Sequence, residues 1–181
     1  IHTAADHGII NNPATSVDME KVVSYKDKVV HKLTSGVTTL LRANGITVIK
    51  GFAKMADEHH ILCNGEVYEA ENTILCGGSV ATRIPIPGIN NPNVLTSTEI
   101  LQLKELPRNL AIIGGGVIGC ELASAFHAFG SNVTIIEATD RLIPLMDREL
   151  SDSLKASMVK QGIKIYTSKK IEEIHDEDSR T

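Results

Sequence analysis

A glycine-rich turn placed between a strand and a helix most constrains the fold of this chain. The apolar run Leu110–Ile113 leads directly into Gly114, Gly116 and Gly119, and an apolar stretch with helical spacing follows. A second apolar run, Asn132–Ile136, comes next. This order predicts a β-α-β unit, and hence a parallel sheet with right-handed crossovers.

Each of the three spaced glycines meets a separate requirement of a dinucleotide phosphate site. Gly114 permits the tight turn out of the strand, Gly116 lets the backbone approach a pyrophosphate, and Gly119 lets the helix pack closely on the sheet. Free N–H groups and the positive dipole end at the helix start would hold the anion. The alternative is an ordinary strand–turn–helix connection. We favour nucleotide binding because the strand, the helix and a later acid stand in the required order.

That later acid is Glu137, which ends the second strand 18 residues after Gly119. A carboxylate there would accept hydrogen bonds from an adenosine ribose diol and repel a 2′-phosphate, so it favours NAD over NADP. Arg141, four residues further on, would weaken that preference if it reached the same place. The alternative for Glu137 is a solvated carboxylate at a strand end.

Composition limits the classes of protein and partner. The 181 residues are 42% hydrophobic and carry a net charge of −4, which allows one or two domains and argues against nucleic acid as a main partner. Four lysines, Lys21, Lys26, Lys28 and Lys32, are expected on the solvated face of a helix. Without a secretory signal pattern or an apolar run of roughly 18 residues, a cytoplasmic protein with no membrane partner is expected.

Three cysteines, Cys63, Cys76 and Cys120, lie 13 and 44 residues apart. Neither spacing is a CxxC pair or a metal-ligand pattern, so no metal is expected and buried structural thiols are favoured over redox chemistry. The pKa of the Cys120 thiol could be lowered because it lies near a helix start.

The first half of the chain predicts a long helix followed by short strands. The helix is expected over Asp18–Ala43, with Ser16 or Asp18 at its start and Asn44-Gly45 at its end. Its apolar stripe consists of Met19, Val22, Val23, Val29, Val30, Leu33, Val37, Leu40 and Leu41. The strands are expected at Ile46–Phe52, His60–Cys63, Glu66–Glu69 and Asn72–Cys76, with a type I′ hairpin turn at Asn64-Gly65.

Connections and further alternation follow. Residues 1–15 look like a loop-rich lead-in, residues 82–93 form a Pro-, Gly- and Asn-rich loop, and Ser97 would cap a short helix to Leu103. Helices at Val117–Phe129 and Asp147–Gln161, ending at Gly130 and Gly162, alternate with strands, the last at Lys164–Thr167. The fold class is therefore α/β, with a Rossmann-like parallel sheet, an antiparallel β meander and a long helix.

In this order the segments resemble the flavin-dependent disulfide oxidoreductases, most closely the members that oxidise dihydrolipoamide. The resemblance extends from Ile1 to about Ile174. It is carried by Lys32-Leu-Thr-Ser-Gly-Val37, Asn44-Gly-Ile-Thr-Val-Ile-Lys-Gly51, Cys76-Gly-Gly-Ser79, Ile86-Pro-Gly88, Thr96-Ser-Thr-Glu99, Gly114-Gly-Gly-Val-Ile-Gly-Cys-Glu121 and Arg141-Leu-Ile-Pro144.

The resemblance implies a domain organisation. Residues 1–105 would form the later part of a split FAD-binding domain, and residues 106–181 the first part of an NAD-binding domain. The family's FAD-phosphate glycine loop, its redox-active CxxxxC pair and its His–Glu pair are not among these 181 residues. The chain therefore resembles an internal fragment, which we expect to be inactive alone.

Family roles extend only to positions that match. The resemblance places Glu137 on the ribose, Ile171 near the adenine and Glu121 beside the nicotinamide. Val117 stands where some relatives have a gating tyrosine, and Cys76-Gly77-Gly78 replaces the family's Ala-Thr-Gly, which alters a flavin contact. The expected NAD contacts are Gly114, Gly115, Gly116, Val117, Ile118, Gly119, Glu121, Glu137 and Ile171, and the expected FAD contacts are Ala53 and Gly78.

The activity implied for the whole protein is oxidation of dihydrolipoamide. Electrons would pass from a thiolate pair to FAD, and a hydride from FAD to NAD⁺, with the protein supplying position. Lipoyl domains of 2-oxoacid dehydrogenase or related complexes would be partners, and the family implies a homodimer. Alternatives are another family member, such as an NADH oxidase or mercuric reductase, and a non-catalytic NAD-binding module.

Overall fold

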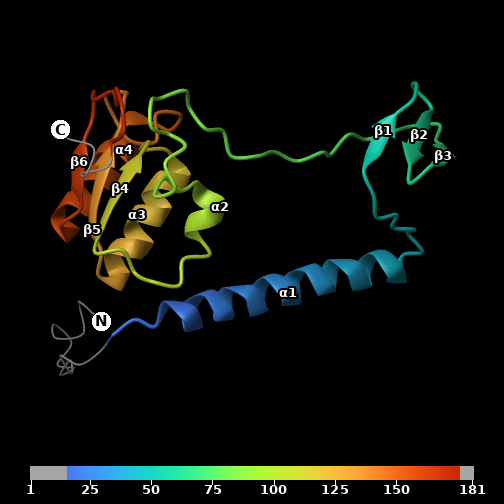
Figure 1. Ribbon diagram of the computed structural model, residues 1–181, viewed down its shortest axis with the longest axis horizontal. Coiled ribbons are helices and arrows are strands. Elements are labelled where there is room, and N and C mark those ends of the chain that lie inside the picture. Colours follow the sequence, from blue (N-terminus) through green and yellow to red (C-terminus); the bar gives the residue numbers. More distant parts are fainter. Residues whose placement is uncertain (1–15, 176–181) are drawn as a thin grey trace. The chain divides into compact units, whose positions relative to one another are not determined.

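The computed structural model describes residues 16–175 (Figure 1). The expectations for residues 1–15 and 176–181 lie outside this range. The described chain divides into two compact units, one made of residues 16–25 and 81–175 and the other of residues 26–80. We call them the parallel-sheet unit and the meander unit. The predicted domain boundary at residues 105/106 remains a prediction.

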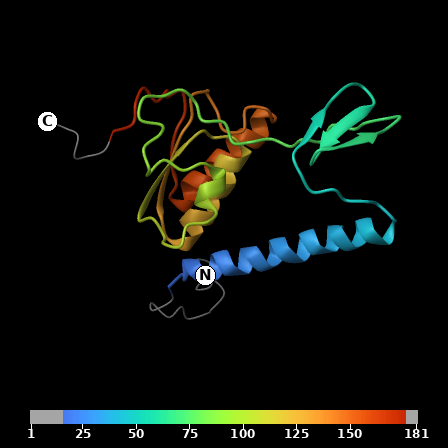
Figure 2. The same ribbon diagram turned by 45° about the vertical axis from the view of Figure 1, so that its right-hand side comes forward.

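The parallel-sheet unit contains the predicted β-α-β alternation. Strands β4 (Asn109–Ile113), β5 (Asn132–Ile136) and β6 (Lys164–Tyr166) form one parallel sheet in that order. Helices α3 (Val117–Phe129) and α4 (Arg148–Gln161) connect them, as Figures 1 and 2 show. Parallel pairing sets Ile113 opposite Ile136, so β4 and β5 end at the same edge. The predicted α/β architecture is confirmed, with β6 one residue shorter than expected.

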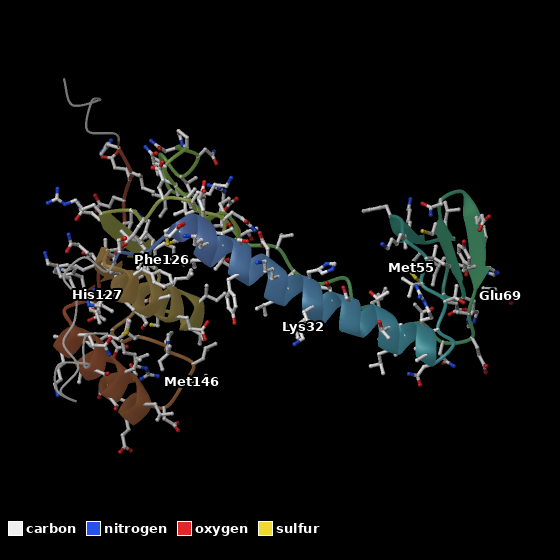
Figure 3. All side chains as sticks on the ribbon, turned by 90° about the horizontal axis from the view of Figure 1, so that it is seen from below. Lys32, Met55, Glu69, Phe126, His127 and Met146 are labelled. Atoms are coloured by element: carbon white, nitrogen blue, oxygen red, sulfur yellow. The ribbon has the colours of Figure 1, made fainter. Side chains whose placement is uncertain are left out.

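The core of this unit lies between the sheet and its helices. On β5 the alternation of strand side chains buries Val133 and Ile135. On α3 the helical spacing buries Ala123 and Phe126 against them. His127 lies in the last turn of α3 (Figure 3). Its Nε2 donates to the Gln161 carbonyl at 2.7 Å and so links α3 to the end of α4.

The N-cap of the short helix α2 (Ser97–Ile100) lies one residue before the predicted one. Thr96, not Ser97, is the N-cap, because its hydroxyl accepts the Thr98 N–H at 3.3 Å. Glu99 completes a capping box by accepting the Thr96 N–H at 2.6 Å. The helix also ends at Ile100 rather than at Leu103, and Ile100 is buried in the core.

Helix α1 (Met19–Ala43) forms as predicted. Asp18 caps its start by accepting the Lys21 N–H at 3.1 Å, and the chain leaves it at Asn44-Gly45 with the Ile46 N–H bonded to the Leu41 carbonyl at 3.0 Å. Of the predicted apolar stripe, only Met19 and Val23 are buried. The exposed members are Val29, Val30, Leu33, Val37 and Leu40.

The meander unit contains three short antiparallel strands. They are β1 (Ala53–Met55), β2 (His60–Cys63) and β3 (Glu66–Glu69), in that order. The predicted hairpin turn is confirmed, because Asn64 and Gly65 have φ values of 55° and 84°. Positive φ at both positions is what a type I′ turn requires.

Two predicted strands are wrong. Ile46–Phe52 and Asn72–Cys76 have no strand structure, and large side chains along them, such as Phe52 and Leu75, are exposed. A strand needs a hydrogen-bonded neighbour, and neither segment has one among the described residues. Cys76 is consequently exposed, contrary to the expectation of a buried thiol, whereas Cys63 and Cys120 are buried.

None of the helices described over residues 16–175 combines the length and apolar character needed to cross a bilayer.

Candidate dinucleotide-binding site

The glycine turn joins β4 to α3 at the edge where the strands end. Gly114 leaves the strand with a φ of 105°, and its N–H still bonds to the Ile136 carbonyl at 2.9 Å. Gly116 is the N-cap of α3, which has no side-chain cap. The first-turn N–H groups of a 13-residue helix therefore lack a side-chain acceptor at the N-cap. A helix start of this kind can bind an anion.

The steric roles predicted for Gly116 and Gly119 agree with the geometry. A Cβ at Gly119 would overlap the carbonyl oxygen of Gly114, so only glycine allows α3 to begin this close to the turn. A Cβ at Gly116 would meet no atom within 4 Å. The backbone at Gly116 is therefore open to a ligand, as close approach of a pyrophosphate requires.

Gly115 has a separate role that the sequence pattern did not indicate. A Cβ at this position would lie 2.5 Å from Cδ2 of Leu142, whose side chain is fully buried. Sequence reasoning included Gly115 only as part of the motif. The Arg141–Pro144 motif was the other sequence feature involved in this contact. Residue spacing could not predict that Leu142 would pack against Gly115, which lies 27 residues earlier.

Glu137 is bonded directly to the glycine turn. Its side chain is only 8% exposed. Oε2 accepts the Gly115 N–H at 2.6 Å, and Oε1 accepts the Thr139 N–H at 2.6 Å. Each carboxylate oxygen has a further lone pair, so ribose hydroxyls could still donate to it. The structure therefore places the acid against the turn, which their order in the sequence predicts.

The charge states at the turn follow from these contacts. Burial alone would raise the pKa of Glu137, but the N–H donors of Thr139 and Gly115 outweigh burial and leave the pKa below its ordinary value. The pKa of Cys120 is raised, first by burial and second by the Glu137 charge. The expectation of a lowered pKa for Cys120 is therefore wrong, because burial and the nearby carboxylate oppose any helix-start effect.

Arg141, the basic residue that could have favoured a 2′-phosphate, is engaged elsewhere. Its Nη2 donates to the Pro144 carbonyl at 2.9 Å, and the side chain is half-buried. Its backbone carbonyl accepts the Thr139 hydroxyl at 2.9 Å. In this conformation the guanidinium is directed to its own loop, and the preference predicted from Glu137 remains a prediction.

Other predicted NAD contacts lie on the same unit but differ in surroundings. Val117 and Ile118, in the first turn of α3, are about half exposed, at 49% and 60%. Glu121 is exposed on the same helix. Ile171 is half-buried in the segment after β6, two residues beyond Lys169, whose N–H bonds to the Glu137 carbonyl at 2.9 Å. Their roles toward a nucleotide remain predictions.

The predicted FAD contacts lie in the meander unit. Ala53 is exposed at the start of β1. Gly78 has a φ of 73°, and a Cβ there would meet no atom within 4 Å. Both positions leave the backbone accessible, and both remain predictions. Across residues 16–175, no three His, Cys, Asp or Glu side chains gather in a metal-binding cluster.

The β-α-β unit and its glycine turn are of the kind found in dinucleotide-binding flavoproteins. The chain belongs to the family described as "Pyridine nucleotide-disulphide oxidoreductase", whose profile matches residues 2–181. The resemblance inferred from the motifs is thereby confirmed.

Curated relatives include two dihydrolipoyl dehydrogenases. That of Acholeplasma laidlawii is 37% identical over 180 residues, covering 97% of this chain and 54% of the relative. That of Bacillus subtilis is 37% identical over 172 residues, covering 93% of this chain and 37% of the relative. The chain thus spans about half or less of these relatives.

Two solved structures share the fold of this chain. The HOCl-induced flavoprotein disulfide reductase RclA from Escherichia coli superposes with a TM-score of 0.78 at 34% identity, covering 97% of this chain and 39% of that one. A ferredoxin reductase from Rhodopseudomonas palustris, at 23% identity and a TM-score of 0.70, shares the fold over 78% of this chain and 38% of that one.

Proposed function

We propose that the parallel-sheet unit carries the NAD pyrophosphate site of a flavin-dependent disulfide oxidoreductase, and that the whole protein is a dihydrolipoyl dehydrogenase. It would convert dihydrolipoamide and NAD⁺ to lipoamide and NADH through FAD. The observation that carries the proposal is the 2.6 Å hydrogen bond from the Gly115 N–H to Glu137. It holds the glycine turn and the carboxylate next to each other, which supports a site in which the turn would face the pyrophosphate and the acid the ribose.

The residues would act by binding and orienting the dinucleotide. The N–H groups at the start of α3 would face the pyrophosphate, and the open backbone at Gly116 leaves room for it. Glu137 would accept the ribose hydroxyls. Glu121, exposed on α3, would lie beside the nicotinamide. When bound, NAD supplies the hydride acceptor, and the protein supplies its position.

The flavin and the partners are proposed from the family. FAD would meet the backbone at Ala53 and Gly78, where the chain is exposed. Residues 1–105 would belong to the FAD-binding domain and residues 106–181 to the NAD-binding domain. The whole protein would act as a cytoplasmic homodimer on lipoyl domains. The 34% identity with RclA supports one alternative, a different flavoprotein disulfide reductase.

The test is calorimetric titration of the 181-residue chain with NADH and with NADPH. We expect NADH or ADP-ribose to bind more tightly than the 2′-phosphorylated forms, because the Glu137 carboxylate would meet a 2′-phosphate as a like charge. Equal or tighter binding of NADPH would contradict the assignment of Glu137. No binding of either would contradict the nucleotide site.

The chain alone should lack the complete reaction. The CxxxxC dithiol and the His–Glu pair of the family are not among its residues, so no route runs from dihydrolipoamide to the nicotinamide. We expect a colourless preparation that forms no NADH from dihydrolipoamide. Flavin absorbance together with dithiol-dependent NADH formation would show this expectation to be wrong.

A further inference from the structure

The segment Arg141–Pro144, between β5 and α4, has an unusual backbone. Ile143 has a φ of 39°, in the left-handed region. A β-branched residue rarely adopts this conformation, and strain of this kind persists only where the surrounding contacts fix the backbone. Ile143 is half-buried against the hydrophobic core, so the segment is also anchored by packing.

Hydrogen bonds fix the backbone of this segment at every carbonyl. Three of the four donors lie outside the segment, on residues that precede it, follow it or belong to α4, so several independent contacts fix its conformation. The bonds are Thr139 Oγ1 to Arg141 O at 2.9 Å, Ser151 Oγ to Leu142 O at 2.7 Å, Met146 N to Ile143 O at 2.9 Å and Arg141 Nη2 to Pro144 O at 2.9 Å.

The segment Arg141–Pro144 contacts Gly115, the middle residue of the three consecutive glycines. The Ile143 N–H donates to the Gly115 carbonyl at 2.7 Å. The Leu142 side chain, fully buried, fills the space behind Gly115 that a Cβ would need. With Glu137 accepting the Gly115 N–H, both polar groups of this residue are held.

We propose that the Arg141–Pro144 segment is a positioning element for the phosphate turn. Leu142 and Ile143 set the orientation of Gly115, and through it the direction of the N–H groups at the start of α3. Three consecutive glycines have wide conformational freedom, and ordering them on binding would cost affinity. A pre-set turn avoids that cost. This inference rests on the proposed nucleotide site and adds residues that would not touch the ligand.

A residue that positions the turn and a residue that only stabilises the core can be distinguished by the part of the ligand whose binding changes. The turn would contact the pyrophosphate directly and the ribose only through the Glu137 carboxylate, so loosening it should weaken ADP-ribose binding much more than adenosine binding. Leu142→Ala removes the support behind Gly115. Ile163→Ala is the matched control, because Ile163 is also a buried aliphatic residue, 2% exposed. It lies just before the start of β6, whereas the glycine turn lies at the edge where the parallel strands end.

The experiment measures the dissociation constants of the 181-residue chain for ADP-ribose and adenosine by NMR titration, with thermal unfolding of each variant. Leu142→Ala should weaken ADP-ribose about tenfold and change adenosine by less than about twofold. Ile163→Ala should lower the unfolding temperature and leave the ratio of the two constants unchanged. Ser151→Ala, which removes the bond to the Leu142 carbonyl, gives a milder variant and should shift the ratio in the same direction.

The outcomes separate this inference from the proposed function. Failure of the wild-type chain to bind ADP-ribose would overturn both. Binding by the wild type, with a ratio unchanged in Leu142→Ala and Ser151→Ala, would overturn the positioning role alone. An equal change in Ile163→Ala would do the same, because it would show that any loss of core packing loosens the turn. Should Leu142→Ala not fold, Ser151→Ala decides.

Discussion

Replacing Glu137 with glutamine should destabilise the parallel-sheet unit in a pH-dependent way. Glutamine keeps the shape of the side chain but has one acceptor oxygen, whereas Glu137 accepts two N–H groups, each at 2.6 Å. One donor, on Gly115 or Thr139, would then face an NH₂ group. Losing one charge-assisted bond and leaving one buried donor unpaired costs about 2 kcal/mol of unfolding free energy, after the relief of a buried charge is subtracted.

The stability difference between wild type and Glu137→Gln should decrease as the pH is lowered. The pKa of Glu137 is held below its ordinary value of 4.5 in the folded state. The charged carboxylate therefore stabilises the fold above the unfolded-state pKa, and that contribution is lost as pH falls through the folded-state pKa. The difference between wild type and Glu137→Gln should be full at pH 7 and shrink at pH values below about 4.

Urea denaturation at several pH values measures this difference. Glu149→Gln is the matched control, because Glu149 is an exposed acid in the first turn of α4 and should change stability by less than about 0.5 kcal/mol. A Glu137→Gln variant as stable as the wild type at pH 7 would refute the reasoning. So would a loss of stability that stays constant between pH 7 and acid, because it would not come from the charged carboxylate.

Two further predictions concern the turn and the thiols. Gly119→Ala should lower the free energy of unfolding by about 1–3 kcal/mol and prevent NADH binding, because its Cβ would overlap the Gly114 carbonyl oxygen. Thermal unfolding and calorimetry measure the two effects, and Ala125→Gly is the control for a substitution elsewhere on α3. Iodoacetamide at pH 7 should label exposed Cys76 first and Cys120 slowest, since burial and Glu137 raise the pKa of Cys120; rapid labelling of Cys120, by mass spectrometry, would contradict this.

The β-α-β unit could be predicted because its signals are local. Helix α3 begins and ends at the predicted residues because glycines mark both ends and the apolar spacing between them is regular. The hairpin at Asn64-Gly65 is predictable for the same reason. Thr96 was missed as the cap of α2 because three consecutive residues of Thr and Ser could each serve, and only the Glu99 contact selects Thr96.

The parts that could not be predicted depend on distant partners. Ile46–Phe52 has the composition of a strand, but composition does not supply a neighbouring strand, and none pairs with it in the described chain. The contact of Leu142 with Gly115 joins residues far apart in sequence. The αL backbone of Ile143 is opposed by its own β-branched side chain, so only tertiary contacts could reveal it.

The uneven burial of α1 has a consequence for its hydrogen exchange. Met19 and Val23 are in or next to the core of the parallel-sheet unit, while Leu33, Val37 and Leu40 are more than half exposed. A helix without tertiary packing is only marginally stable in water. Opening its later turns therefore exposes almost no additional apolar surface and leaves the sheet intact. Amide protection should decline from Val23 toward Ala43, so that one continuous helix spans two regimes of local stability.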